Sequence, residues 1–109
     1  MIQIKDLDVL NLDDKLREIV FAAMRNLDPV VITSAYRHGD AGCHGTQPLR
    51  AIDLRCHDEL YGHSLAEVIN DAWEYDHERL HKRVAIYHDV GQGAHLHLQS
   101  HPNTRRRGR

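Results

Sequence analysis

Two short segments, AIDLR at 51–55 and AHLHLQ at 94–99, alternate between apolar and polar residues. A period of two is typical of a β-strand with one face in the core, because successive side chains point to opposite sides. The chain is therefore expected to fold around a sheet that has one apolar face and one polar face. On the polar face we expect Asp53, His95 and His97.

Two longer segments carry apolar residues at helical spacing. Residues 12–27 follow this pattern, and Asp13 suits the start of a helix there. Residues 64–81 follow it too, with Ser64 and Glu67 spaced as a capping box at the start. We therefore expect two amphipathic helices, each with its apolar face against the core.

The remaining segments complete the expected architecture. Residues 30–36 and 83–90 are rich in β-branched residues and predict strands, whereas the Gly-rich segment 38–48 predicts a loop. The resulting order of elements predicts an α+β domain, with a mostly antiparallel sheet and two main helices packed on one face. We expect a single domain over residues 1–101 and a basic, disordered tail over residues 102–109.

The composition limits the partners and the compartment. A formal net charge of −2 argues against nucleic-acid binding by the whole domain, so only the RRRGR tail suits a phosphate-rich partner. Two cysteines are too few for a disulfide framework. The sequence has neither a signal-peptide pattern nor a membrane-spanning stretch, so we expect a protein that is cytoplasmic as synthesised. We also expect a monomer.

The segment HERLH at 77–81 matches the H-E-x-x-H motif of zinc proteases. Its two histidines lie one turn apart on the expected second helix and could share a metal. However, Arg79 lies inside the motif, basic residues follow it, and no third ligand comes after it at the usual spacing. We therefore interpret His77 and His81 as part of the basic last turn of that helix.

A different set of residues suits a catalytic zinc site better. Asp53 and the histidines His95 and His97 are expected on one sheet face, and His44 lies in a Gly-flanked loop just before the Asp53 strand. Two histidines and one aspartate leave a fourth zinc position for water, as catalytic rather than structural zinc sites do. His88, on a neighbouring predicted strand, could orient one of these ligands.

The order Ser-x-x-Arg (34–37), His44, Ala-x-Asp (51–53) and His-x-His (95–97) resembles that of one family of zinc peptidases. This family comprises the zinc D-alanyl-D-alanine carboxypeptidases and the L-alanyl-D-glutamate endolysins. Its fold is the one shared with the Hedgehog signalling domain. The resemblance extends over roughly residues 12–100, which is nearly the whole expected domain.

The resemblance implies a zinc ion, a reaction and a role for each matched residue. Zinc would be held by His44, Asp53 and His97, and would activate water against a peptide carbonyl. Arg37 would bind a substrate carboxylate or stabilise the oxyanion, with Ser34 and Tyr36 beside the substrate. His95 would act as the general base or hold the oxyanion. The substrate would be the stem peptide of bacterial peptidoglycan.

Two departures from the family pattern keep alternatives open. His44 and Asp53 are two residues farther apart than is usual, so His38 stays an alternative first ligand. Many members also carry an acid shortly before the last histidine, where this chain has GQGAHLH, so the base is either His95 or the distant Asp89. We expect a zinc peptidase of a phage or prophage, delivered to the cell wall by a phage route. The alternative is a non-catalytic zinc-binding module of a phage particle.

Overall fold

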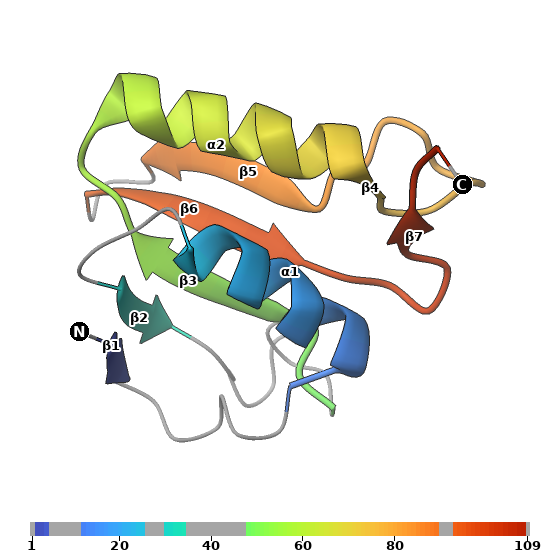
Figure 1. Ribbon diagram of the computed structural model, residues 1–109, viewed down its shortest axis with the longest axis horizontal. Helices are drawn as coiled ribbons and strands as arrows, with labels where there is room; N and C mark the ends of the chain where they lie inside the picture. The colour runs from blue at the N-terminus through green and yellow to red at the C-terminus, as the bar shows by residue number, and fades with distance from the viewer. Residues whose placement is uncertain (1, 5–11, 26–29, 35–47, 90–92, 109) are drawn as a thin grey trace.

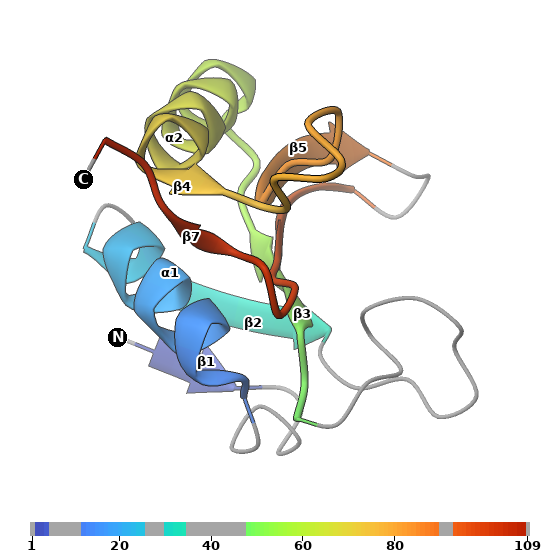
Figure 2. The same ribbon diagram turned by 90° about the vertical axis from the view of Figure 1, so that its right-hand side faces the viewer.

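The structure, a computed structural model, describes residues 2–4, 12–25, 30–34, 48–89 and 93–108. Five strands form one sheet, and two helices lie together on one side of it (Figures 1 and 2). The strands of this sheet are β1 (Ile2–Ile4), β2 (Val30–Ser34), β3 (Ala51–Arg55), β5 (Ala85–Asp89) and β6 (Ala94–Gln99). The helices are α1 (Asp14–Met24) and α2 (Glu59–Ala72). A separate two-stranded ribbon consists of β4 (Trp73–Glu74) and β7 (Arg105–Arg106).

The sheet has the strand order β1-β2-β3-β6-β5. Only β1 and β2 run parallel, whereas the other three neighbouring pairs are antiparallel. This arrangement confirms the predicted α+β class with a mostly antiparallel sheet. The strands predicted at 51–55 and 94–99 are present as β3 and β6, which pair with each other inside the sheet.

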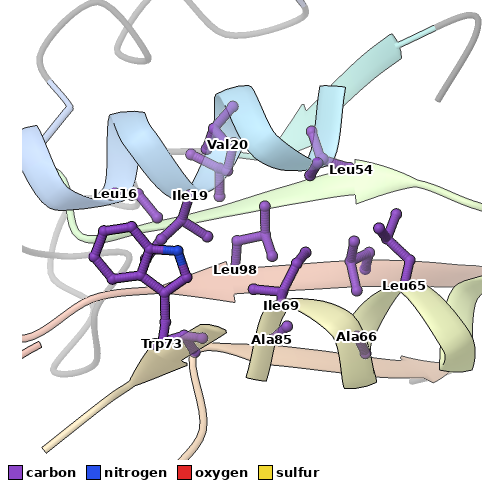
Figure 3. Close-up of a cluster of buried hydrophobic side chains, with 14 of the residues drawn as sticks. Leu16, Ile19, Val20, Leu54, Leu65, Ala66, Ile69, Trp73, Ala85 and Leu98 are labelled. Atoms are coloured by element: carbon purple, nitrogen blue, oxygen red, sulfur yellow. The ribbon is translucent and has the colours of Figure 1, made fainter. Parts of the chain in front are cut away.

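The core fills the space between the two helices and the apolar face of the sheet. Figure 3 shows side chains of α1 and α2 pointing toward one another above the central strands, with Leu98 of β6 between them. The core side of the sheet carries Ile52, Leu54, Leu96 and Leu98, all fully buried. The alternation of the sequence therefore places Asp53, His95 and His97 on the opposite side of the sheet.

The helix α1 follows the sequence pattern closely. Asp13 is its N-cap, and its carboxylate accepts a hydrogen bond from the Leu16 amide at 3.2 Å. The buried residues of α1 are Leu16, Ile19, Val20 and Ala23, which are spaced three and four apart.

The prediction for the second helix was wrong at both ends. The helix begins at Glu59, because Asp58 caps it by accepting from the Tyr61 amide at 3.0 Å. Ser64 and Glu67 are therefore exposed residues inside the helix and do not cap it. It ends at Ala72, and two apolar residues within the predicted range 64–81, Val68 and Leu80, are 62% and 74% exposed.

Contacts from the C-terminal segment explain why α2 ends at Ala72. The amide of Arg107 donates to the Ala72 carbonyl at 2.9 Å, and its guanidinium donates to the carbonyls of Asn70 and Trp73. A continuing helix would offer the same carbonyls to amides four residues later. Trp73 instead adopts an extended backbone with φ −132° and ψ 140°, and its side chain is buried.

The expectation of a disordered tail over residues 102–109 is also wrong for the residues described there. Thr104 is fully buried, and its hydroxyl donates to the Tyr75 carbonyl at 2.8 Å. Arg105 and Arg106 pair with β4, and Arg106 lies 5.2 Å from the centre of the Trp73 ring. An absence of apolar residues suggested disorder, but polar and cation–π contacts fix this segment.

Candidate functional site

The strands β3 and β6 bring Asp53 and His97 together on the polar side of the sheet. The two residues are register partners, so their side chains lie on one face as direct neighbours. His97 Nδ1 lies 2.9 Å from Asp53 Oδ1. Asp53 is only 5% exposed, although it lies on the face away from the apolar core. The carboxylate is thus partnered in a place from which water is largely excluded.

A second histidine reaches the same carboxylate. His95 Nε2 lies 3.8 Å from Asp53 Oδ1, and its Nδ1 lies 3.3 Å from the carbonyl oxygen of Gly93. A carbonyl can only accept, so the Nδ1 of His95 carries the hydrogen in this contact. In the neutral ring, the nitrogen facing Asp53 is then the one with a lone pair.

The sequence suggested no more than an orienting role for His88, which turns out to belong to the same cluster. It is the register partner of His95, and the two ring centres are 4.5 Å apart. The His97 ring centre is 6.1 Å away. Burial lowers the pKa of His88, and the neighbouring histidines His95 and His97 lower it further. The signal for this placement is the period of two along β5. Ala85 and Tyr87 pack with the core, so His88 lies on the polar face of the sheet with its register partner His95.

Gln99 completes a chain of polar contacts along β6. Its Oε1 lies 3.0 Å from His97 Nε2, and its Nε2 donates to the carbonyl of Arg83 at 2.6 Å. Both nitrogens of the His97 ring therefore have polar neighbours, Asp53 on one side and Gln99 on the other. Sequence reasoning gave Gln99 no role, although it lies two residues after His97 on the same face.

Several predicted site residues fall outside what the structure describes. Arg37, Tyr36, His44 and the alternative ligand His38 all lie in the segment 35–47. Ser34 ends β2 and is the register partner of Asp53, which places its backbone next to the candidate site. The roles predicted for these residues stay predictions.

The HERLH segment does not form a metal site among the described residues. His77 and His81 lie in turns after α2 rather than on it, and both are exposed. His77 Nε2 lies 3.8 Å from the carboxylate of Glu78, the glutamate that a zinc protease would need as its base.

The residue just before that segment, Asp76, is buried, with 2% of its surface exposed. Its carboxylate accepts hydrogen bonds from the Glu78 amide, Asn103 and Arg79 at 2.8–3.0 Å. These bonds, the one from the Glu78 amide first, hold the pKa of Asp76 well below its ordinary value. Asp76 thus ties the loop after α2 to Asn103 of the C-terminal segment.

The chemistry of the polar face suits zinc in part. Asp53 and His97 offer one carboxylate oxygen and one imidazole nitrogen that converge, which are ligand types zinc takes in catalytic sites. Over the described ranges, however, no three His, Cys, Asp or Glu side chains are grouped closely enough to hold a metal ion. A third ligand would have to come from the segment that contains His44.

Comparison with protein-family models, with curated proteins and with solved structures finds no match to this chain. Among the helices of the described residues, none combines the length and the apolar character that a bilayer span requires. The geometry of the polar face therefore carries the functional argument.

Proposed function

We propose that the chain is a zinc-dependent peptidase that cleaves a peptide bond in the stem peptide of bacterial peptidoglycan. The observation that carries the proposal is the buried contact between Asp53 and His97 on adjacent strands, with His95 beside it. The resemblance of the motif order to the D-alanyl-D-alanine carboxypeptidases and L-alanyl-D-glutamate endolysins supports it. The lysin of a phage or prophage, carried to the wall by a phage route, is the role that suits this activity.

Asp53 and His97 would hold the metal together with His44 from the neighbouring segment. When bound, zinc lowers the pKa of a water ligand and polarises a carbonyl oxygen. Burial of Asp53 favours metal binding here, because a carboxylate shielded from water gains more from a nearby positive charge.

His95 is the group that would move the proton. Its Nδ1 donates to the Gly93 carbonyl, so its Nε2 has the lone pair directed toward the Asp53 side of the cluster. At that atom the ring can take up a proton from the attacking water and return it to the departing amine. His88 packs edge-on against His95 at a ring-centre distance of 4.5 Å and would hold the His95 ring in place.

Substrate binding in this proposal falls to the segment around Ser34. Arg37 would pair with a carboxylate of the stem peptide, since a guanidinium binds carboxylates through two parallel hydrogen bonds. Ser34 and Tyr36 would lie beside the peptide. The register of Ser34 with Asp53 supports this assignment, because it brings the start of the segment next to the proposed metal ligands.

A second function is favoured by one feature of β6. The stretch before His97, GQGAH, contains no acid, whereas many members of the resembled family carry one shortly before the last histidine. Asp89 lies at the far end of β5, as the register partner of Ala94, and is exposed. If His95 does not act as the base, the site would serve as a non-catalytic zinc-binding module of a phage particle.

Measurement of bound zinc and of muropeptide release from purified peptidoglycan tests the proposal in three proteins. The wild type should bind one zinc ion and release muropeptides, and His97→Ala should lose both. His77→Ala is the matched control, since it removes an exposed histidine of the HERLH segment and should change neither. Loss of zinc in His77→Ala alone would refute the assignment. Zinc binding without release from any wall substrate would select the binding module.

A further inference from the structure

We propose that the turn of residues 77–83 and the ribbon strand β7 form a surface that binds anionic phospholipid membranes, with Leu80 entering the headgroup layer. The turn and the ribbon lie at one end of the molecule, on the right in Figure 1 and toward the viewer in Figure 2. Thr104 links them, because it precedes β7 and donates to the carbonyl of Tyr75, just before the turn. We call this surface, residues 73–83 and 104–107, the basic end.

The turn is held at both of its ends. At its start, the Arg79 amide donates to the Asp76 carbonyl at 3.1 Å, and the Arg79 guanidinium donates to the Asp76 carboxylate at 2.8 Å. At its end, the Arg83 carbonyl accepts from the Gln99 side chain at 2.6 Å. All residues of the turn are nevertheless exposed. A surface held in this way loses little conformational freedom when it binds a partner.

Leu80 is the single apolar residue of the turn, and its side chain points into solvent. It is 74% exposed, Arg79 precedes it, and the run HKR at 81–83 follows it. One exposed leucine alone is ordinary on a protein surface. An apolar side chain among cations, however, is what segments that lie on a bilayer present. The apolar group enters the boundary between headgroups and acyl chains, and the cations attract the anionic headgroups.

The charges of the basic end are arranged with acids inside and cations outside. Glu74 and Asp76 have side chains only 14% and 2% exposed, and the one exposed acid is Glu78, beside His77. The cations are all exposed, and they are Arg79, Lys82, Arg83, Arg105, Arg106 and Arg107. Six cations and three acids give +3, which leaves −5 for all other residues of a chain with a total of −2. An anionic surface would therefore attract this end and repel the rest.

Two of the cations carry their full charge at the surface. Arg105 and Arg107 lie 3.0 and 3.7 Å from the carboxylate of Glu74, which neutralises part of their charge. Within the described ranges, neither Lys82 nor Arg83 pairs with an acid. These two residues follow Leu80 closely in the turn, so they are the ones expected to contact headgroup phosphates when Leu80 is inserted.

Nucleic acid fits the basic end less well than a membrane does. Bases of single strands stack on exposed aromatic rings, whereas Trp73 and Tyr75, the tryptophan and tyrosine of this end, are each only 5% exposed. A duplex offers phosphates to the cations, but its sugar-phosphate surface has no apolar layer that Leu80 could enter. The combination of an exposed leucine with cations therefore favours phospholipid.

The test is sedimentation of the full chain with lipid vesicles at low salt. Each cation near an anionic bilayer strengthens binding roughly fivefold, so a charge of +3 predicts about 100-fold. Vesicles of equal parts phosphatidylglycerol and phosphatidylcholine should bind the wild type more tightly than phosphatidylcholine alone by about this factor. Added salt should weaken the binding, because it screens exposed charges.

Three variants assign the binding to the turn. Leu80→Ala should bind the anionic vesicles about 3–10-fold more weakly, because less apolar surface is buried. Lys82→Gln together with Arg83→Gln should weaken binding about 20–30-fold. Leu60→Ala is the matched control, since Leu60 is 83% exposed but follows the acids Asp58 and Glu59, and it should bind as the wild type does. Thermal unfolding should be the same for all four proteins, because every substituted side chain is exposed.

The result does not depend on the proposed function, because zinc takes no part in this binding. A wild type that does not sediment with the anionic vesicles overturns the proposal, and so does equal binding to phosphatidylcholine alone. A Leu60→Ala variant weakened as much as Leu80→Ala would refute the assignment to the turn. Tighter binding to duplex DNA than to vesicles, with no effect of Leu80→Ala, would show that the basic end is a nucleic-acid site instead.

Discussion

The packing of the C-terminal segment can be tested with one nearly isosteric substitution, Thr104→Val. The Thr104 hydroxyl donates to the Tyr75 carbonyl and accepts from the His101 amide, both at 2.8 Å, and the side chain is fully buried. Valine would fill the same space with a methyl group in place of the hydroxyl. Both hydrogen bonds would be lost while the shape of the core is kept.

The expected loss follows from the surroundings of the two partners. The Tyr75 carbonyl is buried and loses this donor, which costs about 1–3 kcal/mol. The His101 amide is partly buried, and loss of its bond costs about 0.5–1.5 kcal/mol. After the gain from burying a methyl group, about 0.8 kcal/mol, the free energy of unfolding should fall by about 1–4 kcal/mol. For a domain of this size that corresponds to a decrease in Tm of about 4–16 °C.

Urea denaturation followed by circular dichroism and by the fluorescence of Trp73, the single tryptophan, measures this change. Thr33→Val is the matched control, because Thr33 is exposed and its hydroxyl lies 3.4 Å from the Asp53 carbonyl. The control should stay within about 0.5 kcal/mol of the wild type. A Thr104→Val variant equally close to the wild type would refute the packing and restore the expectation of a disordered tail.

Two other predictions concern stability. Gly62→Ala should lower the free energy of unfolding by about 1–3 kcal/mol, because an added Cβ would overlap the ring of Tyr87. In an otherwise unconstrained helix the same change stabilises by about 1 kcal/mol, so a stabilised variant in thermal unfolding would contradict the contact. The pKa of Asp76 is lower in the folded than in the unfolded chain, so the unfolded chain takes up the proton first and stability falls below about pH 4. Urea denaturation at pH 7 and pH 3 should show a smaller difference for Asp76→Asn, and an undiminished difference would argue against this role.

The sheet and its polar face could be predicted because a period of two is a local property of the sequence. The alternation around Asp53 and His97 determines which side chains share a face, whatever the rest of the chain does. That the two residues are direct register partners could not be deduced in this way. Register depends on the pairing of β3 with β6, which are separated by some forty residues in sequence.

The second helix could not be placed correctly because contacts distant in sequence determine its end. The apolar spacing continues past Ala72, but Arg107 takes up the carbonyls that a longer helix would need. At the other end, Asp58 and Ser64 both offer a capping side chain, and propensity alone does not choose between them. The error at Ala72 also placed the HERLH segment on a helix, where its histidines would have faced one another.

The tail was misinterpreted for a related reason. Low apolar content predicts disorder only when no other interactions order the segment. Here Arg105 pairs with Glu74 at 3.0 Å, and Arg106 stacks over Trp73. A run of arginines gives no indication in the sequence of which acid, carbonyl or ring it will meet.

The most direct test of the zinc site is X-ray diffraction from crystals grown with zinc, recorded on both sides of the zinc absorption edge. The account predicts one strong anomalous peak within about 2.0–2.2 Å of Asp53 Oδ1 and His97 Nδ1. A peak at His77 and His81, or a polar face without a peak in zinc-saturated crystals, would contradict it.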